Sequence, residues 1–472
     1  MKLRSGQRRN RLPVSNDLAS TRRLADRRWR RLLFEPLEHR ALLDGVIGGA
    51  IGGAIGGAIG GAVFEDLDRD SVRDVGELPV EGWTVQLQRI GGELQQSLFS
   101  PTPAADDQFG RAIAAMGDDI LVGAYHADAE QPGANIPGTR IVHAGAAYRF
   151  DRLDGRLLQT FVNPTPKADD RFGRAVAAEE DRVLIGAYLD DTAAINAGAA
   201  YLMDAVTGEL LQTLLSPNPV YNDQFGRSVA MAGGNLLIGS RLDDTVGYDA
   251  GAAYLFDGST GDLLQSFFSP SPAWGDQFGY CVAASGNYVA IGARYDDSTA
   301  VDGGAVYLFD ASSGQLLQTF LSPTPDANGA LGRSVAFVGE RLLVGARFDD
   351  SVGEDAGAAY VFDAASGDLL HKLTSPAPAP GDEFGYAVAG VGNDLLVGAR
   401  LDDTAAEDAG AAYLFDGLTG ALLQTYVSPA PADGDRFGVS LAAIGTDVLI
   451  GVHTVRRYAS RRWRGRLSFP RR

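Results

Sequence analysis

The sequence predicts an all-β protein, a seven-bladed β-propeller of four-stranded blades. Three observations predict this fold: a repeated unit, a two-residue hydrophobic period within each unit, and turn residues between the apolar runs. The dipeptide Phe-Gly marks the unit at positions 109, 172, 225, 278, 384 and 437, and Leu331-Gly332 fills the gap. The spacing is 63 residues once and then 53 residues five times. Seven copies of one unit indicate a ring or a solenoid.

Each unit is expected to hold four short strands. In the third unit these are the runs Ser228–Ala232, Leu236–Gly239, Ala252–Phe256 and Leu263–Phe268. Their period of two favours strands over helices. Gly, Asn and Asp residues separate the runs and are typical of turns. Four antiparallel strands per unit, repeated radially, form a propeller blade.

The ring is expected to close through a blade that is shared between the two ends of the repeat. After Gly451 the last unit lacks its third and fourth strands. Residues 82–103 align without a gap with the third and fourth strands of another unit, and Gly82 precedes the next Phe-Gly by 27 residues, as in the third unit. Pairing of these N-terminal strands with residues 437–453 closes the ring and removes both edges.

The repeated phrases Asp-x-Phe-Gly and Gly-Ala-Ala-Tyr-Leu-Phe-Asp resemble the FG-GAP repeats of integrin α chains and of their bacterial relatives. The resemblance covers residues 82–453 and implies an exported bacterial propeller. Integrin-type blades carry a calcium loop between the Phe-Gly strand and the Gly-Ala strand. Here a tight turn around Gly233-Gly234 takes its place, so the chain resembles a shorter bacterial variety without that calcium site. One unit also departs from the pattern, with Gly329 and Leu331 in place of Asp and Phe.

Residues 1–45 are expected to be a basic export or sorting segment, disordered or helical. Positions 1–44 hold 12 Lys and Arg against 5 Asp and Glu. The phrase at 34–43, Phe-Glu-Pro-Leu-Glu-His-Arg-Ala-Leu-Leu, is similar to a segment found on large bacterial surface proteins. A basic disordered arm, or a start codon assigned too far upstream, is the alternative.

Residues 46–62 repeat Ile-Gly-Gly-Ala and are interpreted as a low-complexity linker. The uncharged run 45–64 is a weak candidate for a membrane helix or a glycine zipper, because its glycines fall four residues apart. Its high Gly content lowers both helix propensity and hydrophobicity. We therefore favour no membrane span.

Residues 63–81 form an Asp-rich segment that is similar to a calcium loop and to the opening of an Sdr/Cna-type B domain. Side-chain oxygens and one carbonyl would stand at positions 1, 3, 5, 7, 9 and 12 of the loop. They belong to Asp66, Asp68, Asp70, Val72 (carbonyl), Asp74 and Glu77. Ser71 occupies the place where such a loop has Gly. An Asp-rich surface loop that binds no ion is the alternative.

A second candidate site is a rim of acidic pairs in equivalent loops of successive units. The pairs are Asp190 and Asp191, Asp243 and Asp244, Asp296 and Asp297, Asp349 and Asp350, and Asp402 and Asp403. Carboxylates in this arrangement suit a cation or a ligand. Aspartates also cap turns through the backbone, which is the alternative explanation. Inner-strand arginines (Arg111, Arg174, Arg227 and Arg333) are expected to pair with nearby acids.

The third candidate site is the first blade, which carries ten extra residues between Tyr125 and Gly145. His126, Arg140 and His143 belong to this stretch. An asymmetric loop in a symmetric ring is a natural place for ligand specificity, because binding residues favour loops. A tolerated insertion without function is the alternative.

Charge is segregated along the chain. Residues 454–472 carry eight Arg and no acid, whereas residues 45–453 hold 21 Lys and Arg against 55 Asp and Glu. So acidic a body disfavours nucleic acid and anionic membranes as partners. The basic tail is interpreted as a frameshift or truncation product, with a basic anchor as the alternative.

The sequence predicts a secreted or cell-surface bacterial protein that binds an extracellular protein or glycan, an adhesion protein without catalytic activity. Metal-protease, serine-hydrolase and P-loop motifs are absent from the sequence. Calcium is the one cofactor expected. The alternatives are a carbohydrate-active or other hydrolytic enzyme, favoured by unlike polar residues gathered around the first-blade insertion, and a structural surface-layer component.

Overall fold

The computed structural model describes residues 83–104, 106–130 and 140–453. All of them lie in one of the two compact units of the chain, Gly57–Arg472. Within these residues every regular element is a β-strand. The expected segments 1–45, 46–62, 63–81 and 454–472 lie outside the described residues.

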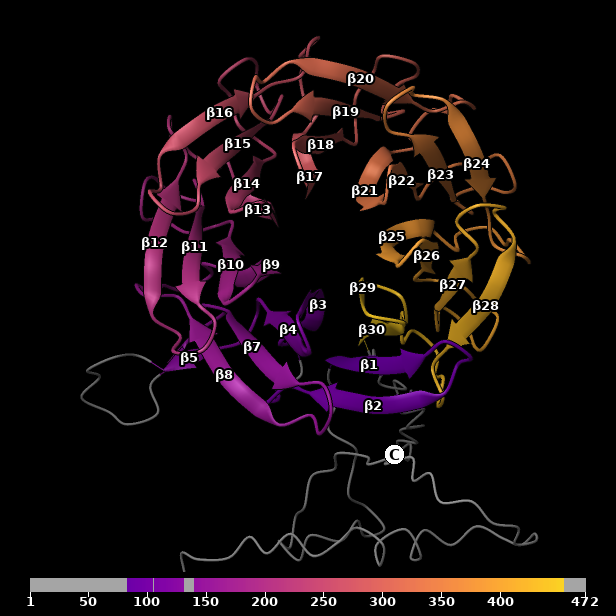
Figure 1. Ribbon diagram of the computed structural model, residues 1–472, viewed down its shortest axis with the longest axis horizontal. Coiled ribbons are helices and arrows are strands. Elements are labelled where there is room, and N and C mark those ends of the chain that lie inside the picture. Colours follow the sequence, from indigo (N-terminus) through magenta and orange to yellow (C-terminus); the bar gives the residue numbers. More distant parts are fainter. Residues whose placement is uncertain (1–82, 105, 131–139, 454–472) are drawn as a thin grey trace, which may run out of the picture. The chain divides into compact units, whose positions relative to one another are not determined.

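Seven four-stranded antiparallel sheets stand around one axis as the blades of a propeller (Figure 1). The inner two strands of the blades, in chain order, are β3 (Phe109–Met116) and β4 (Asp119–Ala124), β9 (Phe172–Glu179) and β10 (Arg182–Ala187), β13 (Phe225–Ala232) and β14 (Asn235–Ser240), β17 (Phe278–Ser285) and β18 (Tyr288–Ala293), β21 (Leu331–Val338) and β22 (Arg341–Ala346), β25 (Phe384–Val391) and β26 (Asp394–Ala399), and β29 (Leu441–Ile444) and β30 (Asp447–His453). The outer two are β7 (Ala146–Asp151) and β8 (Leu157–Val162), β11 (Ala199–Asp204) and β12 (Leu210–Leu215), β15 (Ala252–Asp257) and β16 (Leu263–Phe267), β19 (Ala305–Asp310) and β20 (Leu316–Leu321), β23 (Ala358–Asp363) and β24 (Leu369–Leu373), β27 (Ala411–Phe415) and β28 (Leu422–Val427), and β1 (Trp83–Arg89) and β2 (Leu94–Phe99). We number the blades one to seven in this order.

The predicted ring closure is confirmed. Blade seven has the strand order β2-β1-β30-β29, so its outer half comes from the start of the repeat and its inner half from the end. Strand β1 pairs with β30 in antiparallel register from Trp83 opposite His453 to Arg89 opposite Asp447. Figure 1 shows the first and last strand colours side by side in this blade. Closure leaves neither β1 nor β30 as a free edge.

The Phe-Gly dipeptide ties each blade to the next one. Gly198, at the start of the Gly-Ala strand of blade two, forms a parallel bridge with Phe225 of blade three. Gly226 has a φ of +83°, and a Cβ added there would lie 2.3 Å from the carbonyl oxygen of Ala199. Only glycine allows so close a backbone approach. The two glycines of the repeat thus lock neighbouring blades together.

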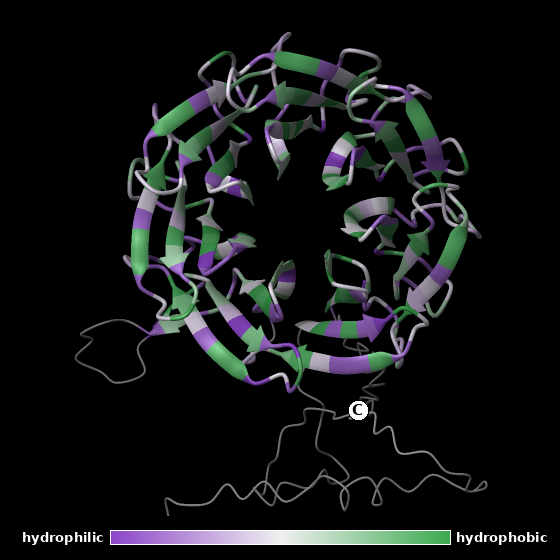
Figure 2. Cartoon of the chain, viewed as in Figure 1, coloured by the Kyte–Doolittle hydropathy of each residue, from purple (hydrophilic) through white to green (hydrophobic). Residues whose placement is uncertain are grey.

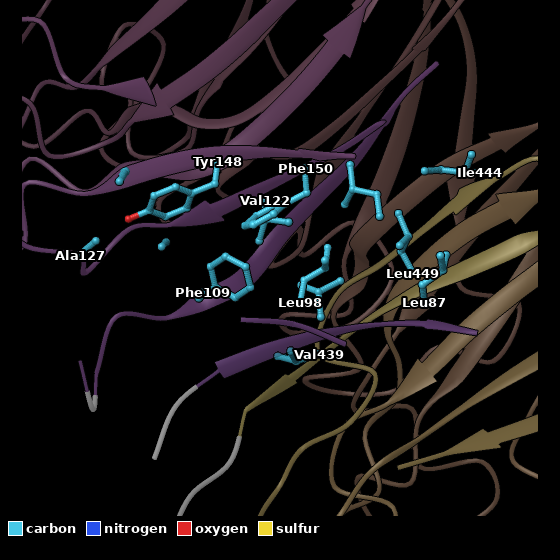
Figure 3. Packing of buried hydrophobic residues seen from close by; sticks show 14 of the residues in the cluster. Leu87, Leu98, Phe109, Val122, Ala127, Tyr148, Phe150, Val439, Ile444 and Leu449 are labelled. Atoms are coloured by element: carbon cyan, nitrogen blue, oxygen red, sulfur yellow. The ribbon is translucent and has the colours of Figure 1, made fainter. Parts of the chain in front are cut away.

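Hydrophobic cores lie between neighbouring blades. In the core that spans the ring closure, Leu87, Leu98 and Leu449 of blade seven belong to the same buried cluster as Phe109 and Phe150 of blade one (Figure 3). Each of these side chains is at most 4% exposed. Burial of these apolar side chains between blades stabilises the ring.

Blade one departs from the others in the insertion that the sequence singles out. Two short strands, β5 (Ala129–Glu130) and β6 (Arg140–Ile141), form a separate two-stranded sheet there. In Figure 2 hydrophobic and hydrophilic residues are interspersed along the inner and the outer strands alike.

Candidate functional site

A cavity of about 220 Å³ lies on the axis of the propeller, lined by the first strands of all seven blades. A bulge in the first strand of blades one to six shapes its wall: in blade three the register jumps from Phe225 opposite Ser240 to Ser228 opposite Gly239. The bulge leaves the residue after Phe-Gly unpaired and turns its side chain to the axis. The seven residues at this position are Arg111, Arg174, Arg227, Tyr280, Arg333, Tyr386 and Val439.

Two tyrosines are the centres of the polar contacts in this cavity. The guanidinium of Arg294 lies 4.0 Å from the ring centre of Tyr280, and Arg227 donates a hydrogen bond of 3.2 Å to the Tyr280 hydroxyl. Arg111 donates to the hydroxyl of Tyr386 at 2.5 Å, and Arg333 lies 4.2 Å from the Tyr386 ring centre. Cation–π contacts of this kind are favourable, and no carboxylate lines this part of the cavity.

A second group of arginines follows the second strand of blades three to six and contacts the rings of the same two tyrosines. Its members are Arg241, Arg294, Arg347 and Arg400. Glu383 is the acid that pairs with this group within the described residues, at 3.4 Å from Arg347 and 2.7 Å from Arg400. The inner arginines Arg111, Arg174, Arg227 and Arg333 form no ion pair within the same residues. The prediction that they pair with nearby acids is therefore wrong, because the bulge turns them away from the acidic loops.

The electrostatics of the cavity follow from this excess of cations. Burial alone would raise the pKa of Tyr386, but Arg111, Arg333 and Arg400 lower it to about 7. The pKa of Tyr280 is lowered by arginines in the same way. Burial, with neighbouring arginines, lowers the pKa of Arg174 and of Arg227 to about 10. The side chain of Arg333 is 9% exposed, and its Nε has no hydrogen-bond partner among the described residues.

The first aspartate of each rim pair is buried and forms hydrogen bonds within its own blade. In blade three Asp243 is 1% exposed, accepts a 2.7 Å hydrogen bond from the Tyr254 hydroxyl and accepts another from the backbone N–H of Thr245. The same tyrosine bond occurs in four other blades, at Asp190, Asp296, Asp349 and Asp402. These carboxylates thus connect the rim loop to the third strand.

The second aspartate of each pair caps its loop. Asp244 accepts the backbone N–H of Asp249 at 2.7 Å. Equivalent bonds hold Asp191, Asp297, Asp350 and Asp403. Turn capping thus accounts for one oxygen of each of these residues, and cation binding by the rim stays a prediction.

A third set of carboxylates, which sequence reasoning missed, lies beside the rim pairs. Asp223 is fully buried, and its Oδ1 has no hydrogen-bond partner among the described residues. Burial, with repulsion from Asp243, raises the pKa of Asp223 to about 7. Burial likewise raises the pKa of Asp170 to about 7 and those of Asp276 and Asp382 to about 6. The sequence signal for this set is the Asp two residues before the Phe of each Phe-Gly dipeptide. It belongs to the repeated phrase Asp-x-Phe-Gly and was not selected as a site.

Blade one brings His126 and His143 together with Asp106. The Nδ1 of His126 lies 3.1 Å from Asp106 Oδ2, and the two imidazole rings are 4.7 Å apart between centres. Arg140 lies in β6, opposite Glu130, and is not part of this group. Two of the three first-blade residues that the sequence selects are thus neighbours, and Asp106 is the residue that sequence reasoning missed.

Several sequence-based predictions lie outside the described residues. They include the calcium loop from Asp66 to Glu77 and the apolar run 45–64. The calcium loop therefore stays a prediction. No helix in the described part of the chain is long and apolar enough to cross a membrane.

Comparison with known proteins gives one family. The family model of the FG-GAP repeat matches residues 93–149, 160–203, 210–256, 269–309, 324–362 and 369–415. No curated protein matches the chain. Among solved structures, a crystal structure of the computationally designed Ika8 protein is 16% identical with a TM-score of 0.44, and the match covers 74% of this chain and 94% of that one.

Proposed function

Because the chain belongs to the FG-GAP repeat family, we propose that it is a non-catalytic binding protein of the bacterial cell surface. Its axial cavity holds an anionic group of an extracellular protein or glycan, and the protein serves in adhesion. The family match and the propeller fold support ligand binding in general. The resemblance of positions 34–43 to a sorting segment supports export.

One observation carries this proposal: the cavity gathers arginines without carboxylates inside a strongly acidic body. Residues 45–453 hold 55 Asp and Glu against 21 Lys and Arg, yet Arg174 and Arg227 line the cavity without an ion-pair partner among the described residues. Like charges at close range are costly, so a fold without a use for them would not be expected to gather them. A carboxylate, sulfate or phosphate group from a ligand would neutralise the cluster.

The experiment compares binding of the full chain to immobilised acidic and neutral polysaccharides and to acidic and neutral peptides. The double variant Arg174→Gln with Arg227→Gln should weaken binding to the acidic surfaces by about tenfold or more, since each lost contact costs on the order of 1 kcal/mol. Arg89→Gln with Arg156→Gln is the matched control, because it removes the same two charges from exposed side chains outside the cavity. Binding that is equal for acidic and neutral surfaces, or unchanged in the double variant, would contradict the proposal.

The phenol of Tyr386 gives a second readout of the same event. An anion beside Arg111 and Arg333 removes part of the positive potential that lowers the pKa of Tyr386 to about 7. Phenolate absorbance at neutral pH should therefore fall when sulfate or a uronic acid is added. The Tyr386→Phe variant should lose this change, which separates it from other tyrosines.

Calcium assistance is the second part of the proposal. Fully buried Asp223, with one oxygen unpartnered among the described residues, lies beside Asp243, and an oxygen-binding cation suits such a pair. A melting experiment with calcium and then with chelator tests this part. If the melting temperature does not change, calcium is no part of the function.

A hydrolytic enzyme is the second candidate function, favoured by one observation. Unlike polar side chains gather beside the first-blade insertion, where Asp106, His126 and His143 approach one another. The test is to incubate the full chain with a panel of glycosides, esters and phosphoesters. Hydrolysis that is lost in the His126→Leu variant would favour this candidate over adhesion. Self-association without any ligand would instead favour a structural surface-layer role.

A further inference from the structure

Three elements of blade one place two imidazoles and a carboxylate at one spot. Asp106 precedes β3, His126 follows β4, and His143 precedes β7. One ligand atom from each residue can be chosen so that all three lie within 4.8 Å of one another. His143 also lies 3.0 Å from Asp169 through its Nδ1. The group is accessible to solvent, since both histidines are half-buried and Asp106 is exposed.

The other blades serve as an internal control for this group. In blades two to six the position of His126 holds an apolar residue: Leu189, Leu242, Tyr295, Phe348 and Leu401. The position of His143 holds Asn or Asp, and all six residues share a left-handed backbone, with φ of 53° at His143 and 51° at Asp249. Asn and Asp suit that conformation at least as well as His does. The fold of a blade therefore does not require either histidine.

The donor set of the group suits a metal ion. It offers two imidazole nitrogens and one carboxylate oxygen within 4.8 Å of one another. The Arg171 guanidinium, which lies near the group, is engaged with Asp169 at 2.7 Å. A cation at this spot would meet one carboxylate and two imidazole rings.

We propose that Asp106, His126 and His143 bind a divalent transition metal of the zinc type. Imidazole nitrogen and carboxylate oxygen are ligands of Zn²⁺, at about 2.0–2.2 Å, whereas Ca²⁺ prefers oxygen alone. Three protein ligands leave a fourth position open for water or for a donor group of a bound ligand. Small rotations of these partly exposed side chains would bring the ligand atoms to the separations that a tetrahedral site needs. This site is distinct from the axial cavity and from the predicted calcium loop at 66–77.

The test is a calorimetric titration of the full, metal-stripped chain with Zn²⁺ in excess calcium, which occupies the oxygen-rich sites beforehand. One ion per chain is expected. The repeat supplies the substitutions that its own fold accepts: His126→Leu as in blade three, His143→Asn as in blade two, and Asp106→Asn as at Asn222. Each should weaken Zn²⁺ binding by about tenfold or more, as loss of a ligand does.

Two controls keep the result clear. His371→Asn removes a half-buried histidine on β24, which is hydrogen-bonded to the Leu418 carbonyl, and should leave Zn²⁺ affinity unchanged. Unchanged melting temperatures of all variants without metal show that they fold. The proposal is overturned if the native chain binds no Zn²⁺, or if His126→Leu and His143→Asn bind it with native affinity.

Discussion

Blade three and blade one share an inner framework and differ at the rim. In blade three the buried Asp243 accepts a hydrogen bond from Tyr254. Blade one has Ala127 at that place, and its Tyr148 hydroxyl instead lies 3.1 Å from Thr102 Oγ1. His126 directly precedes Ala127, and the rim loop that follows carries the insertion and His143. Blade one thus lacks the hydrogen bond between a rim aspartate and the third-strand tyrosine. His126, which belongs to the group with Asp106 and His143, lies next to the position where that aspartate is missing.

The largest effect expected from this comparison is the loss of the buried aspartate in blade three. Asp243→Ala leaves the Tyr254 hydroxyl and the Thr245 N–H without their acceptor, so we expect a loss of about 2–3 kcal/mol in the free energy of unfolding. Asp244→Ala removes only an exposed cap and should cost about 1 kcal/mol. Denaturant midpoints measure both. Equal costs would show that the buried Asp243 contributes no more to stability than the exposed cap does.

A pH dependence of stability is the next effect in size. In the folded chain burial raises the pKa of Asp170 and Asp223 to about 7 and of Asp276 and Asp382 to about 6, above the ordinary value of 3.8. The native state therefore binds more protons than the unfolded state between about pH 4 and 7, and stability falls as pH rises through this window. His126 and His453, with lowered pKa values, act in the opposite direction but are fewer.

Calorimetry in chelator should show a melting temperature several degrees lower at pH 7.5 than at pH 5. Asp223→Asn in blade three should reduce this fall in melting temperature more than Asp107→Asn in blade one does. In blade one Ala127 stands at the position of Asp243, the carboxylate that repels Asp223 in blade three. A melting temperature that rises with pH would contradict the assignment of raised pKa values. Added calcium should reduce the fall if it binds these carboxylates.

The smallest effect on stability is expected at the axial arginines. Arg227→Gln in blade three removes one charge from a like-charged cluster and a single 3.2 Å bond to Tyr280, so its free energy of unfolding should change by about 0.5 kcal/mol or less. Arg111→Gln in blade one should cost more. Arg111 also donates to the Val439 carbonyl at 3.3 Å, across the ring closure. Thermal melts of the two variants make the comparison, and a larger cost at Arg227 would contradict it.

The fold was predictable from the sequence because its signals are local and repeated. Turn residues, the two-residue period and the missing half-unit after Gly451 together determine seven blades and the partner of strand β1. The predicted strand Ser228–Ala232 is found as Phe225–Ala232. It is longer at its start because Phe225 pairs with Ser240 beyond the bulge.

The axial cavity was not predictable in the same way. A period-two pattern gives the side of a strand on which Arg227 lies, but the bulge that turns it to the axis depends on pairing with Ser240 and Gly239. The approach of Asp106 to His126 depends on loop geometry over twenty residues. The sequence signal for this group was the departure of blade one from the repeat. That departure indicated where a site could lie, but not which residues would come together there.

Ring closure has a consequence for the order of events during synthesis. Strand β1 pairs with β30, more than 350 residues further along the chain. A ribosome releases the N-terminal strands long before their partner exists, so β1 and β2 must wait as an unprotected hairpin while six blades form. Contacts this distant in sequence slow folding. A nascent chain of this protein is therefore most exposed to wrong pairing and to proteases at its first hairpin, which only the last strands protect.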